Sequence, residues 1–262
     1  MGGELIERED VDGVAVVRLA HGKVNVLDLE LLAAITSTFR ELDADAHRAV
    51  VLTGAGRAFS AGVDLWRIAD GGADYVAAFL PALSTAFEAV FRAGKPVVAA
   101  VNGPAIAGGC IFAACCDHRV IADVGASIGV TELLVGVPFP TSALEILAYA
   151  AGPPAARAAI LGGAAYEPVE ALTRGLVDEV VPAPALLGHA IAVARRLAAV
   201  PPDTHRLTKQ QLHRATDERI ARLKAEDDPR VRELWTARVA DGSIRAYMQS
   251  IRSRPGGPRG PA

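Results

Sequence analysis

Residues 96–117 read PVVAAVNGPAIAGGCIFAACCD, and the twenty-one residues from Pro96 to Cys116 carry no charge. A helix that crosses a bilayer needs about 20 apolar residues, so this stretch is long enough to be one. The turn signal Asn102-Gly103-Pro104 argues against it, because Pro104 would break a helix at that point. The stretch instead predicts a buried strand, PVVAAV, then a tight turn and a short helix of small residues, GGCIFAACC, all inside the protein.

Strand and helix patterns alternate on both sides of this stretch. The apolar run AVVLT at 49–53 is typical of a strand whose two faces are both covered. Apolar residues at helical spacing predict helices over 28–42, with Asp28 as N-cap, and over 74–93. Further strands are expected in ELIERED, VAVVRLA, HRVIAD and LVDEVV, and further helices over 141–151, 154–161, 168–174 and 184–199. This alternation predicts an α/β fold.

Composition limits the function. The chain has 262 residues, 51% apolar and 22% charged, which fits one sizeable domain with or without a small appendage. A net charge of −3 gives no electrostatic reason to expect nucleic acid. The acidic start shows no signal sequence, and the three cysteines, Cys110, Cys115 and Cys116, are interpreted as reduced thiols rather than metal ligands. We therefore expect a cytoplasmic protein without a metal site and without a membrane segment.

The pattern changes after Pro201, where strand signals stop and charge rises. We expect residues 1–200 to form the core that carries the site, and residues 201–252 to form helices that pack on another surface, possibly a second subunit. A helical extension of the same monomer is the alternative. The last ten residues, 253–262, are rich in Gly, Pro and Arg and are expected to be disordered.

Two glycine-containing turns could each present backbone N–H groups. In GAGRAFSAGVDL, residues 54–65, a strand ends and Asp64 starts a helix, so the N–H groups near Gly62 and Val63 would point outward. Ala107-Gly108-Gly109 is a second such turn. Two N–H sources that converge on one oxygen make an oxyanion hole, but the sequence alone does not show convergence, and each turn could be only a tight turn.

Glu132 is the only charged residue between Asp123 and Glu145. An isolated carboxylate in apolar surroundings has a raised pKa and suits proton abstraction, although a surface or capping glutamate is the simpler interpretation. Ser60 offers serine hydrolysis as a rival, but the G-x-S-x-G elbow is missing because position 58 is alanine.

Taken together, these segments resemble the crotonase (enoyl-CoA hydratase/isomerase) family. The resemblance covers nearly the whole chain, in order and with the spacing kept: VNVLDLELL, VVLTGAGRAFSAGVDL, KPVVAAVNGPAIAGGCIFAACCDHRVIAD, GVTELLVGVPF and LVDEVV. It implies a spiral of ββα turns followed by a C-terminal helical oligomerisation region. It also implies acyl-CoA substrates of fatty acid β-oxidation, no cofactor besides the coenzyme A of the substrate, and a homotrimer or dimer of trimers.

The resemblance also assigns residues. The N–H groups of Val63 and Gly108 fall on the oxyanion-hole donors and Glu132 on a catalytic glutamate. Positions that line the coenzyme A groove are matched by Lys23, Val24, Ala58, Ala61, Asp64 and Leu65, and Trp66 falls where the acyl chain is covered. We further expect substrate contacts from Gly62, Gly109, Ile111 and Thr131, which flank the donors and the base.

Position 111 separates two reactions of the family. Family hydratases resemble one another in carrying a second glutamate three residues after the oxyanion donor, and Ile111 stands there in this chain. Adding water requires that a water be deprotonated and a carbon protonated, a task that two carboxylates share in the family that this chain resembles, whereas moving a double bond requires one base that carries a proton from C2 to C4. The single-glutamate pattern resembles the Δ3,Δ2-enoyl-CoA isomerases. A hydratase or other lyase with an unidentified second acid, and a catalytically silent acyl-CoA-binding protein, are the alternatives.

Overall fold

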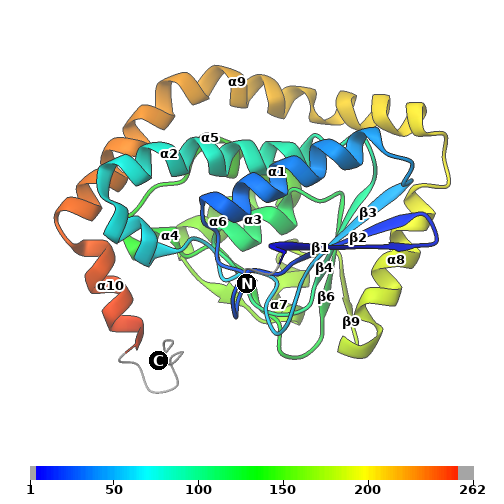
Figure 1. Ribbon diagram of the computed structural model, residues 1–262, viewed down its shortest axis with the longest axis horizontal. Coiled ribbons are helices and arrows are strands. Elements are labelled where there is room, and N and C mark those ends of the chain that lie inside the picture. Colours follow the sequence, from blue (N-terminus) through cyan, green and yellow to red (C-terminus); the bar gives the residue numbers. More distant parts are fainter. Residues whose placement is uncertain (1–3, 253–262) are drawn as a thin grey trace.

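The computed structural model describes residues 4–252, and its centre is a six-stranded sheet in the order β1-β2-β3-β4-β6-β9 (Figure 1). Only β1 and β2 are antiparallel, and every other neighbouring pair is parallel. The strands are β1 Ile6–Val11, β2 Val14–Leu19, β3 Ala49–Gly54, β4 Val97–Val101, β6 His118–Ala122 and β9 Glu179–Val181. The predicted strands and the α/β class are confirmed.

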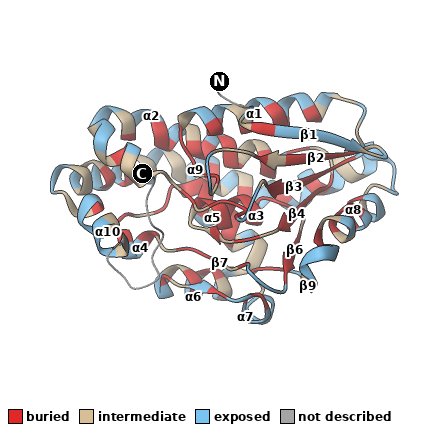
Figure 2. Cartoon of the chain, turned by 60° about the horizontal axis from the view of Figure 1, so that its bottom comes forward, coloured by how far each residue is buried: buried red, intermediate tan, exposed pale blue. Residues whose placement is uncertain are grey.

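Burial explains the sequence of each strand. β3 and β4 are buried at every position, as their continuous apolar runs require. β1, with the sequence IEREDV, is mostly exposed because it is the edge of the sheet, and Figure 2 shows it pale beside the buried inner strands. The turn between β1 and β2 places Asp12 and Gly13 at positive φ, 52° and 80°, which suits a two-residue hairpin.

A second, smaller sheet carries the segments that matter for function. It consists of β5 Ala105–Ile106, β7 Ile128–Gly129 and β8 Ala165–Tyr166. Isolated bridges from Ser60 to Ala105 and from Val63 to Leu27 continue the same layer. Successive turns of chain thus give one strand to the large sheet, one short segment to the small layer and then a helix, which is the ββα spiral that the resemblance implied.

Helices cover both faces of the large sheet (Figure 1). Asp28 caps α1 as predicted, because its Oδ1 accepts from the Leu31 N–H at 2.9 Å. The predicted helix at 74–93 is the later part of a longer helix, α2, in which Gly72 at φ 70° and ψ −158° separates a short first segment from the rest. The helices before residue 200 are α1 Leu29–Ala44, α2 Leu65–Phe91, α3 Gly108–Ala114, α4 Glu132–Val135, α5 Thr141–Ala151, α6 Pro153–Gly162, α7 Pro168–Thr173, η1 Ala183–Ala185 and α8 Leu186–Leu197.

Two helices follow residue 200, α9 Pro202–Ala240 and α10 Ser243–Arg252. α9 runs along α2 and α5 of its own chain (Figure 1), with Arg92 joined to Asp217 at 2.8 Å and Glu88 to Lys224 at 2.8 Å. Trp235 is buried, and its indole N–H donates to the Pro138 carbonyl at 2.9 Å. One face of α9 therefore packs on the same monomer. The expected disordered tail, 253–262, lies outside the described residues.

By length and composition α2 could span a membrane, and half of its most apolar window is buried inside the protein. Its buried side chains include Phe79, Leu83, Phe87 and Phe91, which belong to the main hydrophobic core. α2 therefore serves as a core helix between α1, α5 and α9. The uncharged stretch 96–116 contains the predicted strand, β4, and the predicted helix, α3, and between them the short strand β5, which was not predicted.

Candidate active site

The two glycine-containing turns lie against each other. A side-chain carbon added at Gly62 would lie 3.5 Å from the backbone N of Gly108 and 2.6 Å from the Ile106 carbonyl oxygen. One added at Gly108 would lie 4.0 Å from Cγ2 of Val63 and 2.6 Å from Cδ1 of Leu27. The segments that carry the Val63 and Gly108 N–H groups are therefore neighbours, which the sequence alone did not show.

Both N–H groups are unpaired within residues 4–252. Neither the Val63 N–H nor the Gly108 N–H donates a hydrogen bond there, whereas the Gly62 carbonyl and the Asp64 N–H on either side of Val63 are both used. Gly108 is the first residue of α3 and follows Ala107, whose φ of 53° and ψ of −122° are rare for a residue with a side chain. Such strained conformations concentrate at functional sites.

Glu132 is held close to the start of α3 by the small sheet. Ile106 pairs with Gly129, and the Ala107 N–H donates to the Gly129 carbonyl at 2.8 Å, three residues before Glu132. The pKa of the Cys110 thiol is raised mainly by the burial of that thiol and next by the charge of Glu132, so the Glu132 carboxyl lies close enough to act on Cys110. The base candidate and the second N–H turn therefore lie close together.

The Glu132 carboxyl is buried and incompletely paired. The residue is 9% exposed, and within the described chain its Oε2 has no hydrogen-bond partner. Burial raises its pKa to about 7, while the N–H groups of Glu132 and Thr131 act in the opposite direction. A carboxyl that is about half ionised near neutral pH is well matched to both taking and returning a proton.

The position that would hold a second acid is apolar. All seven residues of α3 are buried, and Ile111 is 1% exposed. Asp64, the nearest acidic residue to Val63 in the sequence, accepts from the N–H groups of Trp66 and Arg67, both at 3.1 Å, and so caps α2. Asp28 is paired with His21 at 2.6 Å and with Arg67 at 2.9 Å. These carboxylates are occupied, in contrast to Glu132.

The expected groove residues lie on the loops that follow β2 and β3. Lys23 is exposed, and Val24 lies beside Ala61, whose N–H donates to the Val24 carbonyl at 2.9 Å. Ala58 is 2% exposed and its carbonyl accepts from Asn25, so it has little surface for a ligand. Among the other expected contacts, the half-buried residues are Ala61, Asp64, Leu65, Trp66 and Thr131. The buried ones are Gly62 and Gly109.

Two features were missed from the sequence: the hydrogen bonds that join Asn25 to Ser60, and the packing of α10. Ser60 is fully buried and serves as no nucleophile, because its Oγ donates to the Asn25 carbonyl at 2.7 Å and accepts from the Gly62 N–H at 3.2 Å. α10 packs on α2 and α4, where the Arg245 guanidinium pairs with Asp70 at 2.6 Å and lies 6.0 Å from the Trp66 ring centre. The single polar residue in V-N-V-L could have drawn attention to Asn25, whereas nothing local in the sequence indicated the α10 contact.

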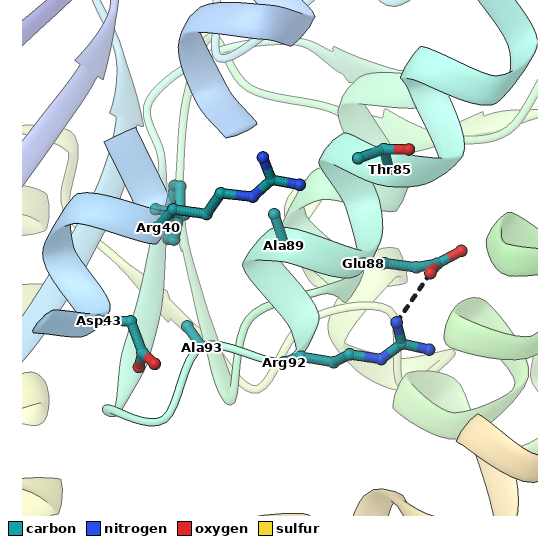
Figure 3. A pocket seen from close by; sticks show the side chains of 8 residues that line it. Arg40, Asp43, Thr85, Glu88, Ala89, Arg92 and Ala93 are labelled. Atoms are coloured by element: carbon teal, nitrogen blue, oxygen red, sulfur yellow. Dashed lines mark hydrogen bonds and ion pairs between the residues drawn. The ribbon is translucent and has the colours of Figure 1, made fainter. Parts of the chain in front are cut away.

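A hollow on the surface lies away from these segments. It has a volume of about 370 Å³, lies between the later parts of α1 and α2 and is lined by Arg40, Asp43, Glu88 and Arg92 among others (Figure 3). Glu88 and Arg92 pair across one turn at 2.8 Å. This hollow shares no residue with the turns around Val63 and Gly108 or with α4, and its acidic groups are paired.

Comparisons with known proteins agree on the family of this chain. Residues 9–248 match the family described as Enoyl-CoA hydratase/isomerase. The mouse mitochondrial enoyl-CoA delta isomerase 1 is 31% identical over 96% of this chain and 88% of its own. A putative enoyl-CoA hydratase of Thermus thermophilus is 40% identical over 72% of this chain and 75% of its own. The crystal structure of the human mitochondrial delta3-delta2-enoyl-CoA isomerase superposes with a TM-score of 0.87 at 29% identity, over 95% of this chain and 98% of that one.

Proposed function

The chain belongs to the enoyl-CoA hydratase/isomerase family of acyl-CoA enzymes, and from this premise we propose that it shifts the double bond of a 3-enoyl-CoA to the 2-trans position. The observation that supports this most directly is the asymmetry of the site. Within the described residues, the buried carboxyl of Glu132 has an oxygen without a partner, and the apolar Ile111 stands where a hydratase of the family would carry its second glutamate.

In the proposed mechanism a single base moves a single proton. Ionised Glu132 removes a proton from C2 of the 3-enoyl thioester, and the electron pair of that C–H bond moves toward the thioester carbonyl to give an enolate. The N–H groups of Val63 and Gly108 hold the enolate oxygen. Protonated Glu132 then returns the proton to C4 as the C2–C3 double bond forms, which regenerates the base. Coenzyme A is part of the substrate, and the chemistry uses no further cofactor.

Hydration of a 2-enoyl-CoA is the second candidate, because the Thermus relative at 40% identity is named a putative hydratase. Water addition would need a group to share the work of Glu132. Within the described chain, Asp64 and Asp28 are engaged in a helix cap and in ion pairs. The isomerase proposal needs no acid–base group beyond Glu132, so it is the one we favour.

The test is a product analysis with 3-enoyl-CoA and 2-trans-enoyl-CoA esters. The unmodified enzyme should isomerise the first and hydrate the second poorly. Glu132→Gln should lower isomerisation by about 10²- to 10⁴-fold while acyl-CoA binding persists, because it removes the base and keeps the shape. Glu167→Gln, at an exposed glutamate, is the matched control and should be unchanged. Efficient hydration by the unmodified enzyme, or full isomerase activity in Glu132→Gln, would refute the proposal.

We also propose that the enzyme assembles as a homotrimer or a dimer of trimers. The support from this chain is apolar surface that its own fold leaves uncovered on α9. Leu207, Leu212 and Leu234 are 56%, 63% and 46% exposed, and Tyr149 of the adjoining α5 is 39% exposed.

A further inference from the structure

Asn25 is a buried polar residue with an unusual backbone. It is 1% exposed and adopts φ 54°, between the half-buried Val24 and Val26. Its Oδ1 accepts from the His21 N–H at 3.0 Å. Its Nδ2 lies within hydrogen-bonding distance of three carbonyl oxygens of the next loop, at 3.2, 2.9 and 3.2 Å, those of Ala55, Ala58 and Phe59. Its donors and its acceptor are therefore all used to hold main chain.

Ser60 extends this arrangement toward Val63. Its hydroxyl donates to the Asn25 carbonyl at 2.7 Å and accepts from the Gly62 N–H at 3.2 Å. On the other side of Gly62, the Leu27 N–H donates to the Gly62 carbonyl at 2.8 Å, and the Asp64 N–H donates to the Leu27 carbonyl at 3.0 Å. The peptide that carries the Val63 N–H is thus fixed from both sides by a segment whose shape Asn25 sets.

Ser60 also touches the second donor segment. Its N–H donates to the Pro104 carbonyl at 3.1 Å, and its carbonyl accepts from the Ile106 N–H at 2.9 Å, two residues before Gly108. A side-chain carbon at Gly109 would lie 2.3 Å from the Ser60 carbonyl oxygen. Ser60 is therefore in contact with both chain segments that carry the proposed donors.

We propose that Asn25 and Ser60 are positioning residues that set the separation and direction of the Val63 and Gly108 N–H groups without touching the substrate. This inference rests on the proposed function, because it assigns the two residues a task in holding the thioester oxygen. Both side chains are fully engaged with main chain, so neither has a group left for the reacting atoms. Their contribution is geometric, and a misplacement of about 1 Å at such a site is enough to lower turnover by about 10²-fold.

Asn102 provides a matched control. It holds the start of the same loop, because its Oδ1 accepts from the Gly54 N–H at 3.0 Å and its Nδ2 donates to the Gly56 carbonyl at 3.1 Å. No described bond of its side chain reaches Ser60, Gly62 or Val63. Asn102→Ala should therefore disturb the loop and the stability of the protein without displacing the donors.

The experiment compares Ser60→Ala, Asn25→Asp and Asn102→Ala in the full chain. Steady-state kinetics with a 3-enoyl-CoA are combined with infrared difference spectra of bound 2-trans-hexenoyl-CoA labelled with carbon-13 at the thioester carbonyl. Ser60→Ala should lower kcat by about 10²-fold with KM little changed, and should move the carbonyl stretch back toward its value in water. Asn102→Ala should keep both kcat and the carbonyl shift.

Asn25→Asp keeps the shape and the acceptor but turns an oxygen toward three carbonyls, so it should act in the same direction as Ser60→Ala. If it does not fold, Ser60→Ala decides the question. An unchanged kcat and carbonyl shift in Ser60→Ala, or equal losses in Asn102→Ala at matched thermal stability, would overturn the positioning role. A protein that polarises the bound carbonyl but isomerises no 3-enoyl-CoA would instead overturn the proposed function, with the positioning role still decided by the carbonyl shift of Ser60→Ala.

Discussion

Glu132→Gln should make the protein more stable at alkaline pH while it removes activity. Burial raises the folded-state pKa of Glu132 from 4.5 to about 7. Between these two values the folded protein holds a proton that the unfolded chain releases, so the free energy of unfolding falls as pH rises through this range and stays lower above it. Glutamine does not titrate, and the variant should therefore escape this loss.

The size of the effect follows from the shift. A pKa that moves from 4.5 to about 7 corresponds to about 3 kcal/mol of destabilisation at pH 8, and to about 1 kcal/mol at pH 5. A buried amide also has a free-energy cost when its polar atoms lack partners, but that cost is the same at both pH values. The difference between variant and parent should therefore grow by about 2 kcal/mol from pH 5 to pH 8 in favour of the variant.

Urea unfolding of both proteins at pH 5 and pH 8 measures this difference, with Glu167→Gln as a control whose effect should not depend on pH. In the parent enzyme kcat/KM should rise through about pH 7 and level off, because the ionised carboxylate is the active form. A stability difference that is the same at both pH values would show that Glu132 does not carry a raised pKa. The assignment of the base would then lose its physical support.

Two further predictions concern position 111 and assembly. Ile111→Glu should place a second carboxyl next to Cys110 and shift the rise of kcat/KM to higher pH, because like charges raise each other's pKa; it should also lower stability, because the new charge is buried. Weak formation of 3-hydroxyacyl-CoA from 2-enoyl-CoA would mark gained hydration, and an unchanged pH profile would place residue 111 away from Glu132. Light scattering of the full chain should give the mass of three or six chains, and the mass of one chain would refute the proposed assembly.

The sequence predicted the elements whose signal is local. β3 and β4 were recognisable because continuous apolar runs require two covered faces, and α1 because Asp28 caps a stripe of apolar residues at helical spacing. α4 was not predicted, since four residues carry too little periodicity, and neither were β5, β7 and β8, which are two residues long. The helix start at Asp64 and the helix at 74–93 were both predicted, but their joining into one element, α2, was missed, because Gly72 interrupts the helical pattern.

The candidate residues were predictable one by one, but their meeting was not. The small sheet brings Glu132 to the start of α3 through the pairing of Ile106 with Gly129, a long-range contact that no local pattern encodes. The packing of α9 on its own chain depends in the same way on pairs such as Glu88 with Lys224, which are far apart in sequence. The tertiary register decides such contacts, and sequence periodicity reports only which face of an element is apolar.

Because the proposed donors are main-chain atoms, substitutions that remove side-chain atoms and substitutions that add them should have the reverse of their usual effects at this site. Val63→Ala would leave the N–H in place. Alanine at Gly62 or Gly109 instead adds a carbon that would lie 2.6 Å from the Ile106 carbonyl oxygen or 2.3 Å from the Ser60 carbonyl oxygen. Alanine scanning normally reads a loss of activity as the loss of a side-chain group. Applied here it would score the glycines as essential and the donor at Val63 as dispensable, so the chemistry of this site is better mapped by substitutions that add atoms than by those that remove them.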